Sequence, residues 1–330
     1  MSERPPPGGL RPPTSPHGGE VKIASDLEKQ LGRKVISVEP IPSGHSGFTY
    51  FVDLDGGARY VLRLPPPGAR PTGPADVVRQ GRIMAALHTA GLPTPAIPAM
   101  SDEPVIDGRP FVLMEAVDGD RIEETGTRHP SHDIAASAVA VLKRLHALPL
   151  DRTGIGADEP TTPQAEMMRW AWLMQRAPEE LTTRAGELGG RLAAGVPAER
   201  EPTLVHGDYH YGNMLFRGAE VVAVLDWEIA QIGQPMLDLG CLCVVSQRRN
   251  FKDAPNPGGS VAVPLADLFS LYGADAGEMN WYVAMSLYKY AAIFGYNLML
   301  HRRGKRPDPM YEKLTSTITG MIEEGISLLS

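Results

Sequence analysis

Polar and apolar residues alternate with the period of β-strands in the N-terminal part of the chain. An apolar helical pattern over Ile23–Leu31 precedes the alternating segment Val35–Ile41. Two further alternating segments, Phe48–Leu54 and Arg59–Leu64, are separated by an Asp-Gly-Gly hairpin signal. These segments predict a helix followed by a small antiparallel sheet.

The pattern changes to a helical period further along the chain. A helix is predicted between Pro74 and Gly91, then a proline-containing extended connection over residues 91–100, then a buried strand at Phe111–Met114. The later helices are expected at Ile134–Leu148, at two places within 162–188 separated by Pro178, at Met236–Ser246 and at Met279–Leu300. This order predicts a disordered Pro/Gly-rich tail (1–19), a sheet-containing domain (20–115) and a mainly helical domain (116–330).

Composition narrows the class of protein. With 330 residues, of which 42% are apolar and 22% charged, the chain can bury a large core in two lobes. The net charge of −7 argues against a nucleic-acid partner, because such proteins are usually basic. No apolar run has membrane-spanning length and no signal peptide is visible. Cys241 and Cys243 lie within an apolar run and are expected as buried thiols, so we expect a cytoplasmic protein.

The residue pattern with the clearest chemistry begins at His206. Asp208 is followed five residues later by Asn213, and a predicted hairpin then ends on Asp226. In phosphoryl transfer an Asp accepts the proton of the attacking hydroxyl, while an Asn and a second Asp hold Mg²⁺ against the nucleotide phosphates. The alternative is a polar turn in which Asp208 and Asn213 bond only to their own backbone.

These motifs resemble those of the aminoglycoside phosphotransferase family, the small-molecule branch of the protein-kinase-like fold. The runs Leu225–Glu228, Gly233–Pro235 and Leu237–Leu239 are similar to the branch that includes the kinase domain fused to some acyl-CoA dehydrogenases. The resemblance covers roughly residues 20–300. It implies an α+β, protein-kinase-like two-lobed fold, with a small antiparallel-sheet N-lobe and a larger, mainly helical C-lobe.

The resemblance also implies which residues bind a nucleotide, ATP or GTP. Ser43, Gly44 and Ser46 are expected in a turn between two strands, where backbone N–H groups can approach phosphate oxygens. An ordinary hairpin loop is the alternative for this turn. The next strand usually carries a Lys that holds the phosphates, and here Arg63 takes that place. Its usual Glu partner on the following helix is replaced by Gln80, so Arg63 pairs with Gln80 or reaches Asp76 one turn earlier.

The segment after the buried strand corresponds to the hinge of the kinase-like fold. Backbone groups at Glu115 and Val117 are expected to bond the adenine edge, and Met114 is expected to line the adenine pocket. Core packing is the alternative for Met114, because backbone recognition leaves little side-chain signature.

Other residues are assigned to the frame of the site or to the acceptor. His206 and Asp238 are expected to support the catalytic loop, with Asp208 as the proton acceptor. Glu228 follows the metal-binding Asp and is a candidate for contact with the acceptor. Trp281 and Tyr288 are further candidates, although core packing is the alternative for either ring.

Together these features predict an ATP- and Mg²⁺-dependent O-phosphotransferase. The acceptor is expected to be a hydroxyl of an apolar small molecule, such as a macrolide, polyketide or hydroxyacyl thioester, because the candidate acceptor segments are rich in Trp, Tyr and Met. The alternatives are an aminoglycoside kinase and, in another class, a non-catalytic nucleotide-binding module. A protein kinase is disfavoured because no activation segment of the usual length follows Asp226. No nucleic acid or membrane partner is expected, and the oligomeric state stays open.

Overall fold

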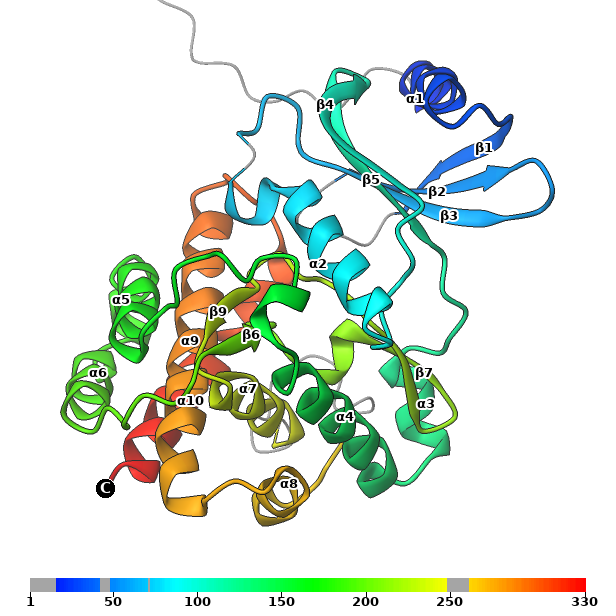
Figure 1. The fold of residues 1–330 in the computed structure, drawn as a ribbon. Coiled ribbons are helices and arrows are strands. Elements are labelled where there is room, and N and C mark those ends of the chain that lie inside the picture. Colours follow the sequence, from blue (N-terminus) through cyan, green and yellow to red (C-terminus); the bar gives the residue numbers. More distant parts are fainter. Residues whose placement is uncertain (1–15, 42–47, 71, 248–260) are drawn as a thin grey trace, which may run out of the picture. The chain divides into compact units, whose positions relative to one another are not determined.

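The structure is a computed structural model that describes residues 16–41, 48–70, 72–247 and 261–330 (Figure 1). It contains two compact units. Of the described residues, those up to 81 and those from 97 to 116 form the first, and those from 82 to 96 and from 117 onwards form the second. The division at 116/117 lies one residue from the boundary expected from the sequence, whereas residues 82–96 belong to the second unit and were expected in the first. Hydrogen bonds hold them there: the amide of Val224 donates to the carbonyl of Pro93 (2.8 Å), and the side chain of Arg144 donates to the carbonyl of Gly91.

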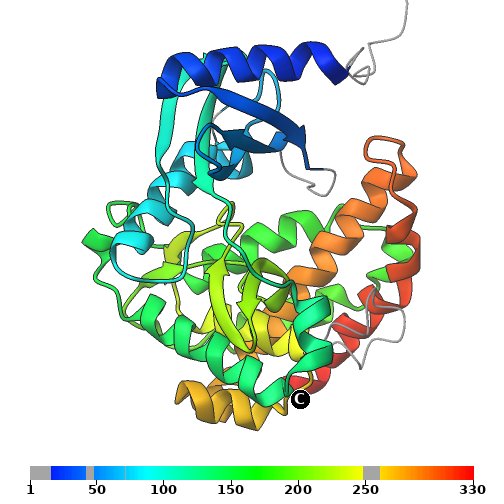
Figure 2. The ribbon, with the colours of Figure 1, turned by 90° about the vertical axis from the view of Figure 1, so that its right-hand side faces the viewer.

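The first unit is a five-stranded antiparallel sheet with the strand order β1-β2-β3-β5-β4. Helix α1 (Pro16–Leu31) lies along one face of it (Figure 2). There Ile23 and Leu27 pack against strand residues that include Leu62 and Leu64. The strands are β1 (Val35–Pro40), β2 (Phe48–Leu54), β3 (Arg59–Leu64), β4 (Ala99–Ile106) and β5 (Arg109–Glu115).

Two boundaries in this unit differ from the sequence expectation. Helix α1 begins at Pro16, so residues 16–19, which were expected in the tail, are helical. Residues 1–15 lie outside the described part of the chain. Strand β4 replaces the end of the expected extended connection; it is an edge strand with mostly exposed or half-exposed residues, so its sequence carries little apolar signal.

The second unit is mainly helical, and its centre is the 27-residue helix α9 (Ala276–Arg302). In Figure 1 this helix, drawn in orange, runs beside α7 and α10. A Cβ atom added at Gly240 of α7 would lie 2.5 Å from the carbonyl oxygen of Tyr282, so only glycine allows this close crossing. The other helices are α2 (Val77–Thr89, which starts in the first unit), α3 (Ile122–Arg128), α4 (Ser131–His146), α5 (Pro163–Met174), α6 (Ala185–Ala194), α7 (Met236–Ser246), α8 (Leu265–Tyr272) and α10 (Thr315–Leu328).

Helices α3, α8 and α10 were not predicted. The first two are only seven and eight residues long, and α10 is rich in Thr, Gly and Ser, which are weak helix formers. Their stability therefore depends on packing against the rest of the unit. Cys241 and Cys243 are buried free thiols, as the sequence indicated. Within the described ranges, the chain has no helix whose length and apolar character would suffice to span a membrane.

Two small antiparallel sheets complete the second unit and hold the motif residues. Strands β6 (Thr203–Val205) and β9 (Gln231–Gly233) form one pair. Strands β7 (Met214–Arg217) and β8 (Glu220–Val224) form the predicted hairpin, in which Met214 lies opposite Val224.

Candidate active site

The β7–β8 hairpin brings the two candidate metal-binding residues to the same place. Asn213 directly precedes β7, and Asp226 is the second residue after β8, so both lie at the open end of the hairpin. The backbone amide of Leu225 donates to the carbonyl of Asn213 (2.8 Å), and the His206 Nε2–H donates to the carbonyl of Leu225 (2.8 Å). These bonds join residues 206–213, called here the catalytic loop, to the end of β8.

Asp238, in the first turn of α7, holds the backbone of the catalytic loop in place. Its carboxylate is fully buried and accepts hydrogen bonds from the backbone amides of His206 (2.7 Å) and Gly207 (2.8 Å). His146 lies 3.3 Å from the same carboxylate and 2.8 Å from the Tyr272 hydroxyl, which gives it a structural position. The turn requires glycine at position 207, since φ is +83° and a Cβ atom would lie 2.7 Å from the Ile229 carbonyl oxygen.

The imidazole of His206 is part of this frame. It is fully buried and its Nδ1 accepts a hydrogen bond from the backbone amide of Asp208 (3.2 Å). Burial lowers the pKa of His206 below its ordinary value of 6.5, although the carboxylate of Asp238 opposes that shift. The ring is therefore neutral near pH 7, and both its nitrogens serve to hold backbone.

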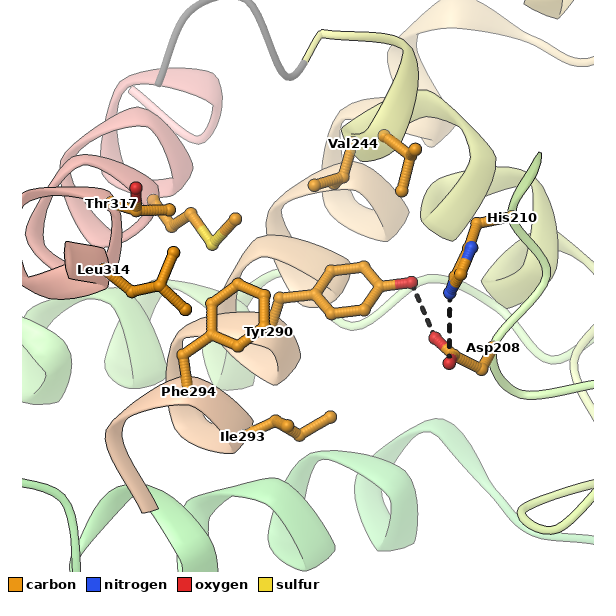
Figure 3. A pocket seen from close by; sticks show the side chains of 10 residues that line it. Asp208, His210, Val244, Tyr290, Ile293, Phe294, Leu314 and Thr317 are labelled. Atoms are coloured by element: carbon orange, nitrogen blue, oxygen red, sulfur yellow. Dashed lines mark hydrogen bonds and ion pairs between the residues drawn. The ribbon is translucent and has the colours of Figure 1, made fainter. Parts of the chain in front are cut away.

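The carboxylate of Asp208 is held from two sides (Figure 3). Its Oδ1 accepts the hydroxyl hydrogen of Tyr290 (2.8 Å) and lies 3.8 Å from the Nζ of Lys289. Its Oδ2 lies 3.3 Å from the Nε2 of His210 and 3.3 Å from the Nδ2 of Asn213. Because His210 Nδ1 accepts the amide N–H of Gly212 (3.0 Å), it is the Nε2 that carries a hydrogen and donates it to Asp208.

These contacts decide the ionisation of Asp208. Burial alone raises the pKa of this carboxyl, but His210, Lys289 and the Tyr290 hydroxyl together hold its pKa well below the ordinary 3.8. The side chain nevertheless keeps 29% of its surface exposed. An ionised, accessible and oriented carboxylate has the form that a proton acceptor requires. Asn213 also donates to the backbone carbonyl of Asp208 (3.0 Å), so the local turn bonding weighed from the sequence is present as well.

Three residues around Asp208 were missed from the sequence: His210, Lys289 and Tyr290. His210 lies inside the motif and was passed over as a spacer. Lys289 had a signal, because it is the one charged residue between positions 279 and 300. Nothing in the sequence distinguished Tyr290 from the other aromatic residues of α9. Its position depends on how α9 is rotated, which tertiary packing decides.

The residues proposed from the sequence to bind Mg²⁺ fit such an ion. Asn213 uses its amide nitrogen on Asp208, so its side-chain oxygen is the atom that would bind the ion. Asp226 has φ of +64°, a left-handed conformation that is uncommon outside glycine and typical of strained functional positions. The described residues contain no group of three His, Cys, Asp or Glu side chains that could hold a metal by themselves. Two oxygen donors suit Mg²⁺, which completes its shell with water and phosphate oxygens.

A cavity of about 200 Å³ opens beside Asp208, and we call it the acceptor cavity because an acceptor hydroxyl is expected to meet Asp208 there. Figure 3 shows Asp208 and His210 at one end, the rings of Tyr290 and Phe294 between, and Leu314 and Thr317 towards the other end. Asp208 is the single carboxylate among the described lining residues, and no Lys or Arg lines the cavity there. The described residues that line it are Asp208, His210, Val244, Val245, Tyr290, Ile293, Phe294, Leu314, Thr317 and Met321.

The candidate acceptor contacts chosen from the sequence lie elsewhere. Trp281 is buried and its Nε1–H donates to the carbonyl of Leu192 (2.9 Å) in α6. The Tyr288 hydroxyl also lies beside α6, 3.7 Å from the Cβ position of Gly189. Each residue turns an α-helix by about 100°, so positions 281 and 288 share one face, while 290 and its neighbours 293 and 294 face the opposite way. Helix α9 thus lines the cavity, but with other residues. Glu228 is half-buried and is not among the described lining residues.

The described residues expected to bind the nucleotide belong to the first unit, except Val117. Arg63 lies on β3 opposite Val112, and Gln80 is buried on α2. Asp76 accepts the backbone amide hydrogen of Arg79 (2.9 Å), so it caps the start of α2. Ser43, Gly44 and Ser46 fall outside the described residues. Met114 is buried on β5, Glu115 is its exposed last residue, and Val117 is the first residue of the second unit's main segment.

Comparisons with known proteins identify the family of the chain. Residues 37–281 match a family model described as the phosphotransferase enzyme family. The chain is 30% identical over 271 residues to acyl-CoA dehydrogenase family member 10 of Mus musculus, which covers 76% of this chain. The matched part of this chain spans only 25% of that relative's length.

Solved structures share the fold. One is a crystal structure of an aminoglycoside phosphotransferase homologue from Ralstonia eutropha JMP134, with a TM-score of 0.76, 23% identity, and coverage of 92% of this chain and 97% of that one. Another is an aminoglycoside phosphotransferase in a ternary complex with ADP and hygromycin B, with a TM-score of 0.61 and 15% identity over 93% of this chain and 98% of that one. These likenesses confirm the predicted kinase-like fold.

Proposed function

Because the chain belongs to the phosphotransferase enzyme family and is a small-molecule kinase, we propose that it phosphorylates a hydroxyl of a largely apolar acceptor, with ATP and Mg²⁺. One observation carries the choice of acceptor. The acceptor cavity has apolar walls, and its single carboxylate in the described chain is Asp208.

In the proposed reaction Asp208 takes the proton of the acceptor hydroxyl while the hydroxyl oxygen forms a bond to the γ-phosphorus of ATP. The bond from that phosphorus to the β–γ bridging oxygen breaks, and ADP leaves. Asn213 and Asp226 would hold Mg²⁺, which neutralises charge on the phosphates. Arg63 would hold the phosphates, while Met114, Glu115 and Val117 would contact the base. The rate would depend mainly on orientation and on charge stabilisation.

The cavity argues against a polycationic acceptor. An aminoglycoside carries several ammonium groups and would need several carboxylates around it, yet the described walls offer one. The volume of about 200 Å³ is also below the range of about 300–1,000 Å³ that encloses drug-sized ligands. The described cavity therefore favours a short hydroxylated apolar segment, such as the chain of a hydroxyacyl thioester, over a whole macrolide. The relative in Mus musculus supports that class of compound, because its name refers to acyl-CoA, which is an acyl thioester.

A phosphorylation screen tests this proposal. Purified protein, ATP and Mg²⁺ are incubated with hydroxyacyl thioesters, apolar alcohols, macrolides and aminoglycosides, and products gaining one phosphoryl group are found by mass. We expect transfer to hydroxylated apolar compounds. Transfer to aminoglycosides alone would establish the antibiotic-kinase alternative, and nucleotide binding without transfer to any acceptor would establish the non-catalytic alternative.

The same screen tests the role of Asp208. In Asp208→Asn we expect kcat to fall by about a thousandfold, because the general base is lost while the shape of the loop stays. ATP affinity, measured by calorimetry, should stay close to that of the wild type. Asp133→Asn is a matched control, since Asp133 is an exposed carboxylate in the first turn of α4. Undiminished kcat in Asp208→Asn would refute the assignment of the base.

A further inference from the structure

Lys289 is a buried charge next to the site. Its residue surface is only 3% exposed, although it lies in the middle of the apolar helix α9. Burying an ammonium group costs several kcal/mol unless polar or charged groups surround it. A lysine retained at such a position therefore has partners that require its charge.

The ammonium group of Lys289 has four kinds of neighbours. It donates a hydrogen bond to the carbonyl of Gly207 and lies 3.5 Å from the Sγ of Cys241. It lies 3.8 Å from Asp208 Oδ1, and the rings of Trp170 and Tyr290 are centred 5.3 and 5.1 Å away. Burial raises the pKa of the Cys241 thiol, so this neighbour stays uncharged. Asp208 is thus the closest negative charge to Lys289 among the described contacts.

A second carboxylate, Glu166, is near but engaged with other groups. Its Oε1 accepts the Trp170 Nε1–H (2.6 Å) and its Oε2 accepts a hydrogen from Gln231 (2.9 Å). Burial alone lowers the pKa of Lys289, whereas Cys241, and after it the carboxylates of Asp208, Glu166 and Asp238, raise it, so that the net shift is upward. Lys289 is therefore charged at neutral pH.

We propose that Lys289 is a positioning residue for phosphoryl transfer: its ammonium group holds the Gly207 carbonyl and the Asp208 carboxylate in the orientation that receives the acceptor's proton. The inference rests on the proposed function. Lys289 is not among the described residues that line the acceptor cavity, so it acts through Asp208 rather than on the substrate. It approaches Oδ1 from the side of α9, while His210 and Asn213 approach Oδ2 from the catalytic loop. The carboxylate is thereby fixed at both oxygens.

The first experiment removes the charge of Lys289 and measures kcat and KM separately. In Lys289→Met, which conserves volume, we expect kcat to fall about a hundredfold because the base is displaced. KM for ATP should change by less than about threefold, since Lys289 is not among the residues proposed to bind the nucleotide. Lys143→Met is the matched control: Lys143 donates to the Leu271 carbonyl (3.3 Å) on an exposed surface, and its loss should leave kcat unchanged. Lys289→Gln, which keeps a hydrogen-bond donor without the charge, provides a second variant should the Met variant not fold.

The second experiment does not depend on activity. The unfolding equilibrium constants of the wild type, Lys289→Met, Asp208→Asn and the double variant are measured in urea and form a double-mutant cycle. If Lys289 pairs with Asp208, the two changes are non-additive by at least about tenfold in that constant. Additive effects, or kcat within about twofold of wild type in a folded Lys289 variant, would overturn the proposal. Absence of transfer by the wild type would refute the proposed function, while the cycle would still test the pairing.

Discussion

The catalytic loop and the wall of the acceptor cavity lie side by side in the second unit but are built by opposite means. In the loop, the backbone amides and carbonyls and the side chains of His206, Asp208 and Asn213 are fixed by short hydrogen bonds, many of them buried. The wall offers mainly apolar surfaces from α7, α9 and α10, with Thr317 as a further polar group.

The hydrogen-bonded loop is suited to the chemical step, whereas the apolar wall is suited to the choice of acceptor. Directional bonds specify geometry within tenths of an ångström, as a proton acceptor requires. Apolar walls select by size and shape and discriminate weakly between homologous ligands. Tyr290 belongs to both regions, because its ring lines the cavity and its hydroxyl holds Asp208. We therefore expect substitutions among the residues that hold the catalytic loop to abolish activity. Substitutions in the wall of the acceptor cavity are expected to change which acceptor is used.

The largest effect on stability is expected from removal of the Asp238 carboxylate. Asp238→Ala leaves the buried amides of His206 and Gly207 without their acceptor, at about 1–3 kcal/mol for each group. We expect the free energy of unfolding in urea to fall by about 4 kcal/mol, with loss of transfer. Asp267→Ala is the control, since Asp267 is an exposed carboxylate in the first turn of α8 and its loss should cost less than about 1 kcal/mol. Equal losses in the two variants would contradict the support role.

A smaller effect, on selectivity, is expected from the wall. Phe294→Ala enlarges the cavity beside Tyr290. In the wild type the rings of Phe294 and Tyr290 are stacked, with their centroids 6.2 Å apart. We expect the ratio of kcat/KM for a longer over a shorter apolar acceptor to rise by about tenfold, with stability nearly unchanged because Phe294 is only half-buried. Trp172→Ala removes an exposed ring outside the cavity and should leave the ratio alone. A lowered kcat with an unchanged ratio would instead assign Phe294 to the residues that hold the catalytic loop.

The smallest effect is a pH dependence of stability that originates in His206. Its folded pKa is lowered, so below about pH 6.5 the unfolded chain binds a proton that the folded protein excludes. The free energy of unfolding should therefore fall as the pH decreases below 6.5, by at most about 1.4 kcal/mol per pH unit from this group. His206→Gln should flatten that slope, whereas His132→Gln, at an exposed position, should keep it. An identical slope in wild type and His206→Gln would exclude this origin.

The sequence by itself determined the fold class and the spacing of Asp208, Asn213 and Asp226. A hairpin of fixed register follows from local alternation and a tight turn, so residues 13 apart meet without information from the rest of the chain. The strands at 48–54 and 59–64 and the helix at 236–246 were found for the same reason: their signals lie within a few neighbouring residues.

Only the tertiary structure decided which residues of α9 face Asp208. Every face of this buried helix is apolar or aromatic, so periodicity does not show its rotation, and Trp281 and Tyr288 were chosen over Tyr290 and Phe294. The same holds for Lys289, whose partner Asp208 lies 81 positions earlier in the chain. Helix packing set by contacts such as Gly240 against Tyr282 supplies that rotation, because close-packed helices can meet in few orientations.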